Sequence, residues 1–191
     1  MRKPVLFKQP VLLILACIFS GSCFSQNNLA VGINFTGGFT SSSDFVVVPG
    51  LTLEKQIKKH SGFETGLYYK TVKLHGKVFV DGRVYGNQII KENYISVPVL
   101  YKFNSSLLNF SVGPTFDFYT GWKQSKKGIV FPWIYYAPNH KFIAGFLGKV
   151  SKTVGLTKRF FLEPEIRYNP VLSAGKSFYG IGISGKYRFG K

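Results

Sequence analysis

Charged residues recur at every second position near the end of the chain. Glu163, Glu165 and Arg167 alternate with other residues, and Lys186 and Arg188 repeat this spacing closer to the C-terminus. Side chains two residues apart lie on the same face of a β-strand, so each segment has one charged face. The chemistry that this spacing favours is ion pairing between facing strands, with the two acids as partners of Lys186 and Arg188. A path for protons or small solutes is the alternative.

Other segments carry ionisable residues on the corresponding face. The set that we expect to line a common interior is Glu54, Glu64, Lys70, Lys102, Asp117, Glu163, Glu165, Arg167, Lys186 and Arg188. An unpaired buried charge is very costly, so these groups should neutralise one another across strands. We therefore expect a network of ion pairs that fills the interior.

Support for catalysis or metal binding is thin. Residues 41–43 (three serines), Asp44, His75 and His140 have the types of a hydrolytic triad, but no spacing motif links them. With three histidines, and with both cysteines in residues 1–25, no metal-ligand pattern remains. We predict no enzyme, no cofactor and no metal ion.

The beginning of the chain has the pattern of a secretory signal peptide. Basic residues precede the apolar run 11–19, and small residues lead to a cleavage site near Gln26. The run has about half the length that a membrane-spanning helix needs. We expect residues 1–25 to be removed on export and 26–191 to form one domain. Lipid attachment at Cys23 is an alternative.

The chain is strongly basic, with a formal net charge of +17. Such a charge often indicates nucleic-acid binding, but export and the lack of a basic helix argue against it. Membrane lipid and the phosphates of lipopolysaccharide are the better partners. A scattered, solvated surface charge is the alternative.

Alternation of apolar and polar residues continues through most of the remaining chain. It predicts eight strands, at residues 29–39, 45–57, 62–80, 83–103, 106–119, 140–154, 159–169 and 177–189. The segment 140–154 is apolar on both faces, so its faces cannot be assigned. Pro49, Pro98, Pro114 and Pro164 lie within predicted strands, where each should mark a bulge or irregularity because proline has no N–H for the ladder.

The links between these strands alternate in length. Short links follow the second, fourth and sixth strands, and mostly longer ones follow the others. This asymmetry and the even strand count are typical of outer-membrane barrels. We predict an all-β fold, an eight-stranded antiparallel transmembrane β-barrel of OmpA/OmpX size, located in the bacterial outer membrane. A soluble exported lipocalin-like barrel, apolar inside, is the alternative.

Aromatic residues gather at the ends of the predicted strands, as expected for the two interfaces of a bilayer. Near the outer interface we expect Tyr69, Tyr94, Phe118, Tyr119, Trp122, Tyr168 and Tyr179. Near the periplasmic interface we expect Tyr101, Phe103, Phe160, Tyr187 and Phe189.

Two outer segments could contact a partner. The segment 77–85 alternates around an Asp-Gly pair, which favours a tight turn. Its strands are about twice as long as a bilayer requires, so they should project as a hairpin with open edges. The loop 120–139 combines lysines with aromatic residues. The candidate interaction surface is Phe79, Asp81, Gly82, Tyr85, Phe131, Trp133, Tyr135 and Tyr136.

Several segments resemble one known family. Tyr94–Lys102 (YISVPVLYK), Ser111–Pro114 (SVGP) and the Arg167-Tyr168 strand, followed by a last strand that ends in Phe189, resemble the PorT-like outer-membrane β-barrel family of Bacteroidota. The resemblance covers nearly the whole exported chain and implies an outer-membrane barrel. The member that gives the family its name is associated with type IX secretion.

The sequence therefore predicts a non-enzymatic, monomeric outer-membrane barrel with a filled polar lumen. Its outer loops and projecting hairpin would serve interaction, adhesion or the assembly of a secretion system, with a protein partner on that side. The alternatives are an outer-membrane lipid-modifying enzyme and a narrow channel.

Overall fold

The computed structural model describes residues 29–80, 83–125, 138, 140–170 and 177–189. Its strands are β1 (Leu29–Thr40), β2 (Phe45–Lys58), β3 (Ser61–Val80), β4 (Arg83–Asn104), β5 (Asn109–Gln124), β6 (Phe142–Ser151), β7 (Val154–Gly155), β8 (Phe160–Asn169) and β9 (Phe178–Phe189). No helix in these residues has the length and apolar character needed to cross a bilayer.

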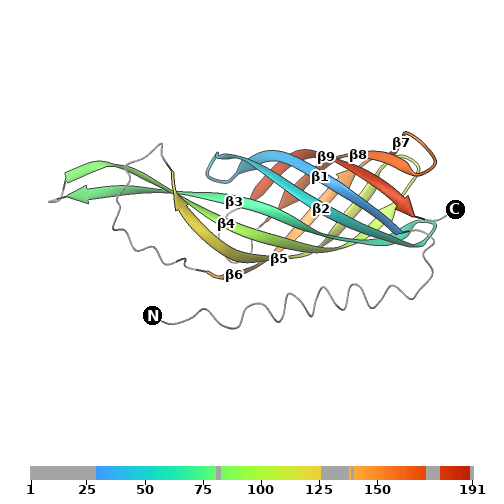
Figure 1. Ribbon diagram of the computed structural model, residues 1–191, viewed down its shortest axis with the longest axis horizontal. Coiled ribbons are helices and arrows are strands. Elements are labelled where there is room, and N and C mark those ends of the chain that lie inside the picture. The colour runs from blue at the N-terminus through green and yellow to red at the C-terminus, as the bar shows by residue number, and fades with distance from the viewer. Residues whose placement is uncertain (1–28, 81–82, 126–137, 139, 171–176, 190–191) are drawn as a thin grey trace.

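Eight of the strands form a closed antiparallel ring. Each strand from β1 to β5 pairs with the next one along the chain, β9 pairs with both β1 and β8, and β6 pairs with β8. The short strand β7 lies outside this count and pairs with β8. Figure 1 shows the strands wound around a common axis. The predicted eight-stranded barrel is confirmed.

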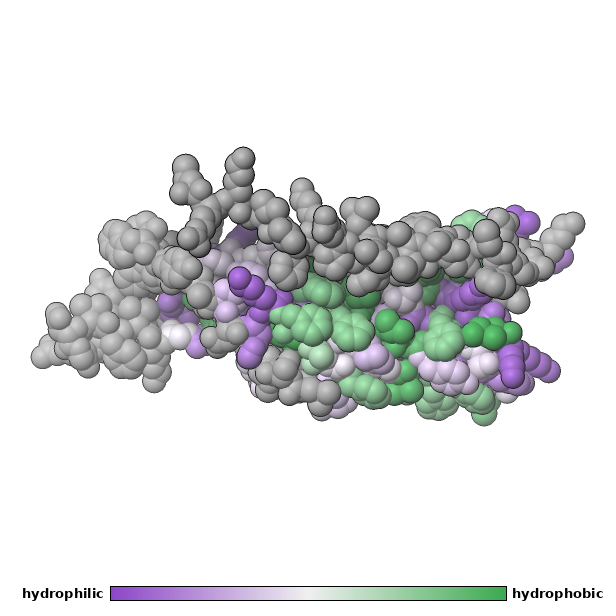
Figure 2. Space-filling model, turned by 90° about the horizontal axis from the view of Figure 1, so that it is seen from below, coloured by the Kyte–Doolittle hydropathy of each residue, from purple (hydrophilic) through white to green (hydrophobic). Residues whose placement is uncertain are grey.

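Apolar side chains cover the outside of the ring. Ile33, Ile166 and Ile181 are 54%, 65% and 69% exposed, whereas Asn34 and Thr36 on the opposite face of β1 are fully buried. Figure 2 shows hydrophobic residues across the middle of the barrel and hydrophilic residues toward its ends. A lipocalin-like barrel would have the opposite polarity, so this arrangement excludes it. An apolar exterior and a polar interior are typical of membrane barrels.

Most of the predicted interface aromatics face outward at the strand ends. At one end these are Tyr69, Tyr168 and Tyr179, and at the other end Tyr101, Phe103, Phe160 and Phe189, with exposed fractions of 44–53%. The prediction is wrong for Tyr94, which is 3% exposed. The alternation of β4 turns Tyr94 inward, where its hydroxyl donates a hydrogen bond of 2.9 Å to Glu92.

Two strand boundaries differ from the prediction for local reasons. The segment 140–154 is interrupted after Ser151, and the backbone N–H of Lys152 there donates to the carbonyl of Pro164. Because Pro164 has no N–H to donate in return, the ladder breaks opposite it. The fifth strand begins at Asn109 rather than at residue 106, since Ser105 Oγ accepts hydrogen bonds from the N–H groups of Leu107 and Leu108 and closes a turn.

Register shifts do not coincide with the prolines. They lie between Gln56 and Lys58 in β2, between Val78 and Phe79 in β3, and between Asn93 and Tyr94 in β4. No bulge lies at a proline of the described strands, but the expected irregularity is present at Pro98 and Pro114, where the ladder with one neighbouring strand lacks pairs and the register stays the same. The irregularity at Pro164 is an interruption without a change of register.

Three strands continue beyond the ring. The β2–β3 ladder ends at the pair Gly50–Tyr68, and the β5–β6 ladder ends at the pair Phe118–Phe142. Beyond these pairs, β3, β4 and β5 remain paired with one another. We call this three-stranded extension the ribbon. It projects past the other strands in Figure 1.

Candidate functional site

A cluster of charged side chains fills the barrel interior. We call it the ionic core, and its members are Glu54 on β2, Glu64 on β3, Lys102 on β4, Lys149 on β6, Glu163, Glu165 and Arg167 on β8, and Lys186 on β9. Each is at most 7% exposed. Acidic and basic members are equal in number, so the ionic core is neutral when every member is charged.

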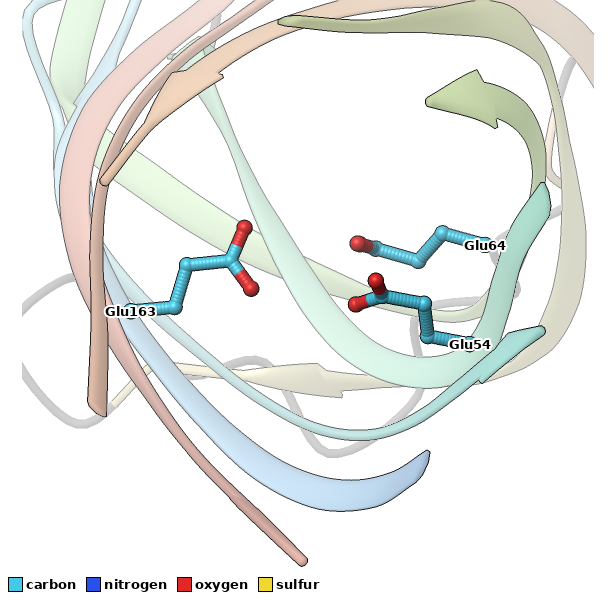
Figure 3. A group of neighbouring side chains, drawn as sticks. All are labelled: Glu54, Glu64 and Glu163. Atoms are coloured by element: carbon cyan, nitrogen blue, oxygen red, sulfur yellow. The ribbon is translucent and has the colours of Figure 1, made fainter. Parts of the chain in front are cut away.

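Three carboxylates meet at its centre. Glu54, Glu64 and Glu163 reach toward one another from opposite walls, as Figure 3 shows, and their oxygens lie within 4.8 Å of one another. Lys102 Nζ lies 2.8 Å from Glu54 Oε2 and 2.7 Å from Glu163 Oε1. Lys186 Nζ lies 2.5 Å from Glu163 Oε2 and 2.8 Å from Glu54 Oε2. It lies 3.2 Å from Glu64 Oε2.

The two ammonium groups occupy the place that a cation would take. Carboxylate oxygens at this spacing suit a metal ion, but the chain's own amines already supply the positive charge. Glu54 and Glu64 are direct cross-strand partners, and like charges in such a pair repel each other. Lys186 contacts both and offsets this repulsion.

A second part of the ionic core lies around Glu165. Its Oε1 accepts a hydrogen bond from Arg167 Nη2 and another of 3.0 Å from Asn34 Nδ2, and Lys149 Nζ lies 3.4 Å from Oε2. The Arg167 guanidinium also stacks on the ring of Tyr68, at 4.9 Å from its centroid. Charged groups that leave water need this number of partners to remain ionised.

Two of the predicted lumen residues form a separate pair. Lys70 Nζ donates a hydrogen bond of 2.5 Å to Asp117 Oδ2. Close to this pair is a cavity of about 30 Å³, lined in part by Tyr68, Lys70, Arg167 and Asn169. A cavity of this volume has room for ordered water. The buried Nε of Arg167 has no hydrogen-bond partner in the described protein, so a water molecule there would satisfy it.

The expected pairing of Arg188 with the lumenal acids is wrong. Arg188 lies two residues beyond Lys186, toward the end of the ring. Its guanidinium lies 4.6 Å from the centroid of the Phe161 ring, against which it stacks. The carboxylates of Glu163 and Glu165 lie deeper along β8, next to Lys186 and Arg167.

Sequence reasoning missed Lys149. The segment that contains it is apolar on both faces, because Ile143 and Leu147 point inward while Phe142 and Phe146 point outward. Only the last inward positions of β6 are polar, and Lys149 Nζ contacts Glu64 Oε1 there. Lys149 and Ser151 were the available signal. They are polar and two residues apart, so they lie on the same face of the strand and mark it as the lumenal one.

The turn between β1 and β2 contacts the ribbon. Asp44 Oδ2 lies 2.8 Å from His75 Nε2, within hydrogen-bonding distance. Asp44 Oδ1 lies 3.4 Å from Lys73 Nζ. Burial tends to raise the pKa of the Asp44 carboxyl, but the hydrogen bonds and charges of His75 and Lys73 outweigh it and lower that pKa below 3.8. Among the described residues, no serine hydroxyl contacts His75, so a hydrolytic triad is not assembled here.

The candidate interaction surface falls almost entirely outside the described residues. Asp81, Gly82, Phe131, Trp133, Tyr135 and Tyr136 are not described, and neither are the side chains of Phe79 and Tyr85. The backbone at positions 79 and 85 belongs to β3 and β4 of the ribbon.

Comparisons with known proteins bear on the fold. No protein-family model matches the chain, and no curated protein does. The outer membrane protein OprG of Pseudomonas aeruginosa has a similar structure, with a TM-score of 0.53 and 12% sequence identity over 86% of this chain and 99% of OprG. Neisserial surface protein A gives 0.48 at 12% identity (86% and 98% covered), and Ail of Yersinia pestis gives 0.47 at 8% (84% and 96% covered).

The similarity to OprG agrees with the closed ring of eight strands. The fold is that of an outer-membrane β-barrel. At this level of identity the similarity concerns the fold alone. What the barrel does must be argued from its own lumen, exterior and ribbon.

Proposed function

We propose that this chain is an integral outer-membrane barrel with a closed lumen, which acts through its ribbon and outer loops rather than by conduction or catalysis. The observation that carries the proposal is the ionic core. Its carboxylates and amines contact one another at the place where a pore would need water, and the cavity beside them has a volume of only about 30 Å³.

Several features support location in the outer membrane. The exposed apolar residues of the ring would contact lipid, and the polar lumen would be shielded from it. Residues 1–25 would act as the export signal and be removed. The resemblance to PorT-like barrels of Bacteroidota fits the same location, and a monomer needs no further strand because the ring is closed.

The ribbon supports a role in contacts with other proteins. Beyond Tyr68, β3 has no ladder partner on the β2 side among the described residues, and beyond Phe118 the same holds for β5 on the β6 side. Such edges present backbone groups that an added strand can pair with. Adhesion, or assembly with a secretion system, would use this surface.

Conductance measurements test the closed lumen. The folded protein, verified by its heat-dependent mobility on gels, is inserted into planar lipid bilayers. We expect no conductance steps, whereas a porin inserted in the same way gives them. Steady unitary steps from the wild-type barrel would contradict a closed lumen.

Site-specific photo-crosslinking tests the role of the ribbon. A photoreactive amino acid at Leu74, on the ribbon, should give a discrete protein adduct in cells, while the same amino acid at Ile183, on the apolar exterior of the ring, should give none. Replacing residues 73–91 by a two-residue turn should abolish partner binding and leave the barrel folded. Adducts that appear equally from both positions would count against a ribbon-mediated contact.

A further inference from the structure

Three lysines form a row across the ribbon. Lys73 on β3 is the direct cross-strand partner of Lys91 on β4, and Lys91 is the partner of Lys123 on β5. Directly opposed residues of antiparallel strands point to the same face, with Cβ atoms about 5 Å apart. Like charges in this arrangement are destabilising. We call these residues the lysine row.

A single bulge produces this alignment. Between the pairs Tyr94–Tyr119 and Asn93–Gly121, β5 contains one extra residue, and Gly121 has a φ of 154°. Without the extra residue, Trp122 would lie opposite Lys91. The bulge moves Lys123 into that place and gives it the same facing as the other two lysines. A conformation with positive φ favours glycine, which explains this residue at the bulge.

The described acids leave most of the row without a countercharge. Those of the ionic core are neutralised within the lumen, Asp117 pairs with Lys70, and Glu92 is buried on the opposite face of β4. Asp44 contacts Lys73 at 3.4 Å. In the described part of the chain, no acid contacts the other two lysines of the row. Among the described residues, these two ammonium groups are therefore open to an anion from another molecule.

The depth of the row indicates which molecule this is. Moving outward along the exterior face, the cross-strand pairs are Tyr69–Ile95, then Thr71–Asn93, then Lys73–Lys91. Tyr69 and Ile95 are 47% and 41% exposed and would still contact acyl chains. The lysines lie four residues farther out, about 13 Å along the strand. This succession of apolar, polar and cationic rows follows the change from acyl chains to charged headgroups.

We propose that the lysine row binds the phosphate groups of lipopolysaccharide in the outer leaflet. The proposal rests on the proposed location in the outer membrane and adds a ligand to it. Each ammonium would contact phosphate oxygens directly, and the closely spaced amines would match a headgroup that carries more than one phosphate. Basic residues near a membrane surface each contribute appreciably to attraction for anionic lipid.

Binding measurements with purified, folded protein in detergent test this site. The probes are lipopolysaccharide, the same lipopolysaccharide after removal of its phosphates, and inorganic phosphate. We expect the variant Lys73→Gln/Lys91→Gln/Lys123→Gln to bind lipopolysaccharide at least about tenfold more weakly than the wild type. Added salt should reduce wild-type binding. The dephosphorylated lipid should bind to the wild type as weakly as intact lipid binds to the variant.

A matched variant controls for net charge. Lys58→Gln/Lys59→Gln/Lys158→Gln removes the same charge at the opposite end of the ring and should keep wild-type affinity. If both triple variants weaken binding equally, or if neither does, the lysine row is not the site. Competition by inorganic phosphate at the concentration of the lipid would also overturn the proposal, since it would indicate a site for free phosphate.

Folding and location are checked separately. Heat-dependent gel mobility reports whether each variant is folded, and Lys91→Gln/Lys123→Gln keeps the contact between Lys73 and Asp44 if the triple variant does not fold. A wild-type protein that never enters bilayers would contradict the proposed function. A barrel that inserts but binds lipopolysaccharide without the row would contradict only the present inference.

Discussion

Lys186 is, with Lys102, one of two lysines that contact all three central carboxylates of the ionic core. Its ammonium contacts Glu54, Glu64 and Glu163, which come from three different strands. Without it, these three carboxylates would have only Lys102 and Lys149 as nearby amines, and the repulsion among their negative charges would be less well offset. Since the group is 2% exposed, water cannot replace the missing charge at low cost.

Replacing this lysine by an apolar residue of similar length should therefore be strongly destabilising. For Lys186→Met we expect a loss of about 3–5 kcal/mol in the free energy of unfolding, the range for removal of one partner from a buried ion pair. Urea titration in lipid vesicles measures it. Lys158→Met, at an exposed turn position, is the control and should change stability by less than about 0.5 kcal/mol.

Removal of one carboxylate should restore part of that loss. The double variant Lys186→Met/Glu54→Gln again has equal numbers of acids and bases in the ionic core, so we expect it to be more stable than Lys186→Met alone. A double-mutant cycle in urea gives the coupling free energy. Additive effects of the two substitutions would show that direct charge balance is not what stabilises the lumen.

Much of the ionic core follows from strand alternation. Glu163, Glu165, Arg167 and Lys186 face the lumen because the period of a strand is two, and the structure brings them together. Lys149 could not be assigned, since alternation carries no information where both faces are apolar. Arg188 stacks on Phe161 because it lies near the end of the barrel. Alternation in the sequence indicates which face a residue is on, but not how deep it lies in the barrel.

At the scale of elements, small residues allow the β1–β9 seam to close. A Cβ added at Gly180 would lie 2.7 Å from the carbonyl oxygen of Gly37 and 2.9 Å from Phe178 Cζ. One added at Gly185 in the same strand would meet only Ile33 Cγ1, at 4.0 Å. The two positions thus form a matched pair within β9.

Gly180→Ala should destabilise the barrel, and Gly185→Ala should not. We expect a cost of about 1–3 kcal/mol for Gly180→Ala, because the added methyl group overpacks the seam. Urea titration of the two variants side by side measures the difference. Equal stabilities would indicate that the seam adjusts without cost.

The contact between the β1–β2 turn and the ribbon should depend on pH. Because the pKa of Asp44 in the folded protein lies below 3.8, its contacts with His75 and Lys73 contribute stability above that pH. This contribution is lost as the pH falls through the lowered pKa. An NMR titration of the Asp44 carboxyl should give a midpoint below 3.8 in the wild type. In His75→Ala/Lys73→Gln the midpoint should rise, and an unchanged midpoint would rule out these two contacts as the cause.

Strand positions were predictable to within a few residues, but their ends and offsets were not. The break at Pro164 depends on which residue lies across the ladder, and the turn at Ser105 depends on a side chain that caps a backbone bend. The bulge at Gly121 shifts a register by one residue and so decides which lysines align. Each of these is a relation between two strands, which alternation within one strand cannot show.

For the whole molecule, the separation of polarity between lumen and exterior makes lipid the natural solvent. Exposed apolar side chains surround the ring, and the barrel has no open edge there because β6 pairs with β8. In lipid, a closed ring satisfies the backbone hydrogen bonds within the protein. In water, the same exterior would be a large apolar surface prone to association.

A charge on this exterior should therefore cost more in the middle of the wall than near its rim. Ile183 lies at the middle of β9 and is 46% exposed, whereas Tyr179 lies near one end of the strand and is 52% exposed. For Ile183→Arg we expect a loss of about 2–4 kcal/mol in lipid vesicles, and for Tyr179→Arg about 0–1 kcal/mol. If the barrel were surrounded by water, both arginines would be solvated and neither substitution would cost more than about 0.5 kcal/mol. Urea titration of both variants in the same vesicles separates the two situations, because only a lipid-embedded wall makes the cost depend on depth.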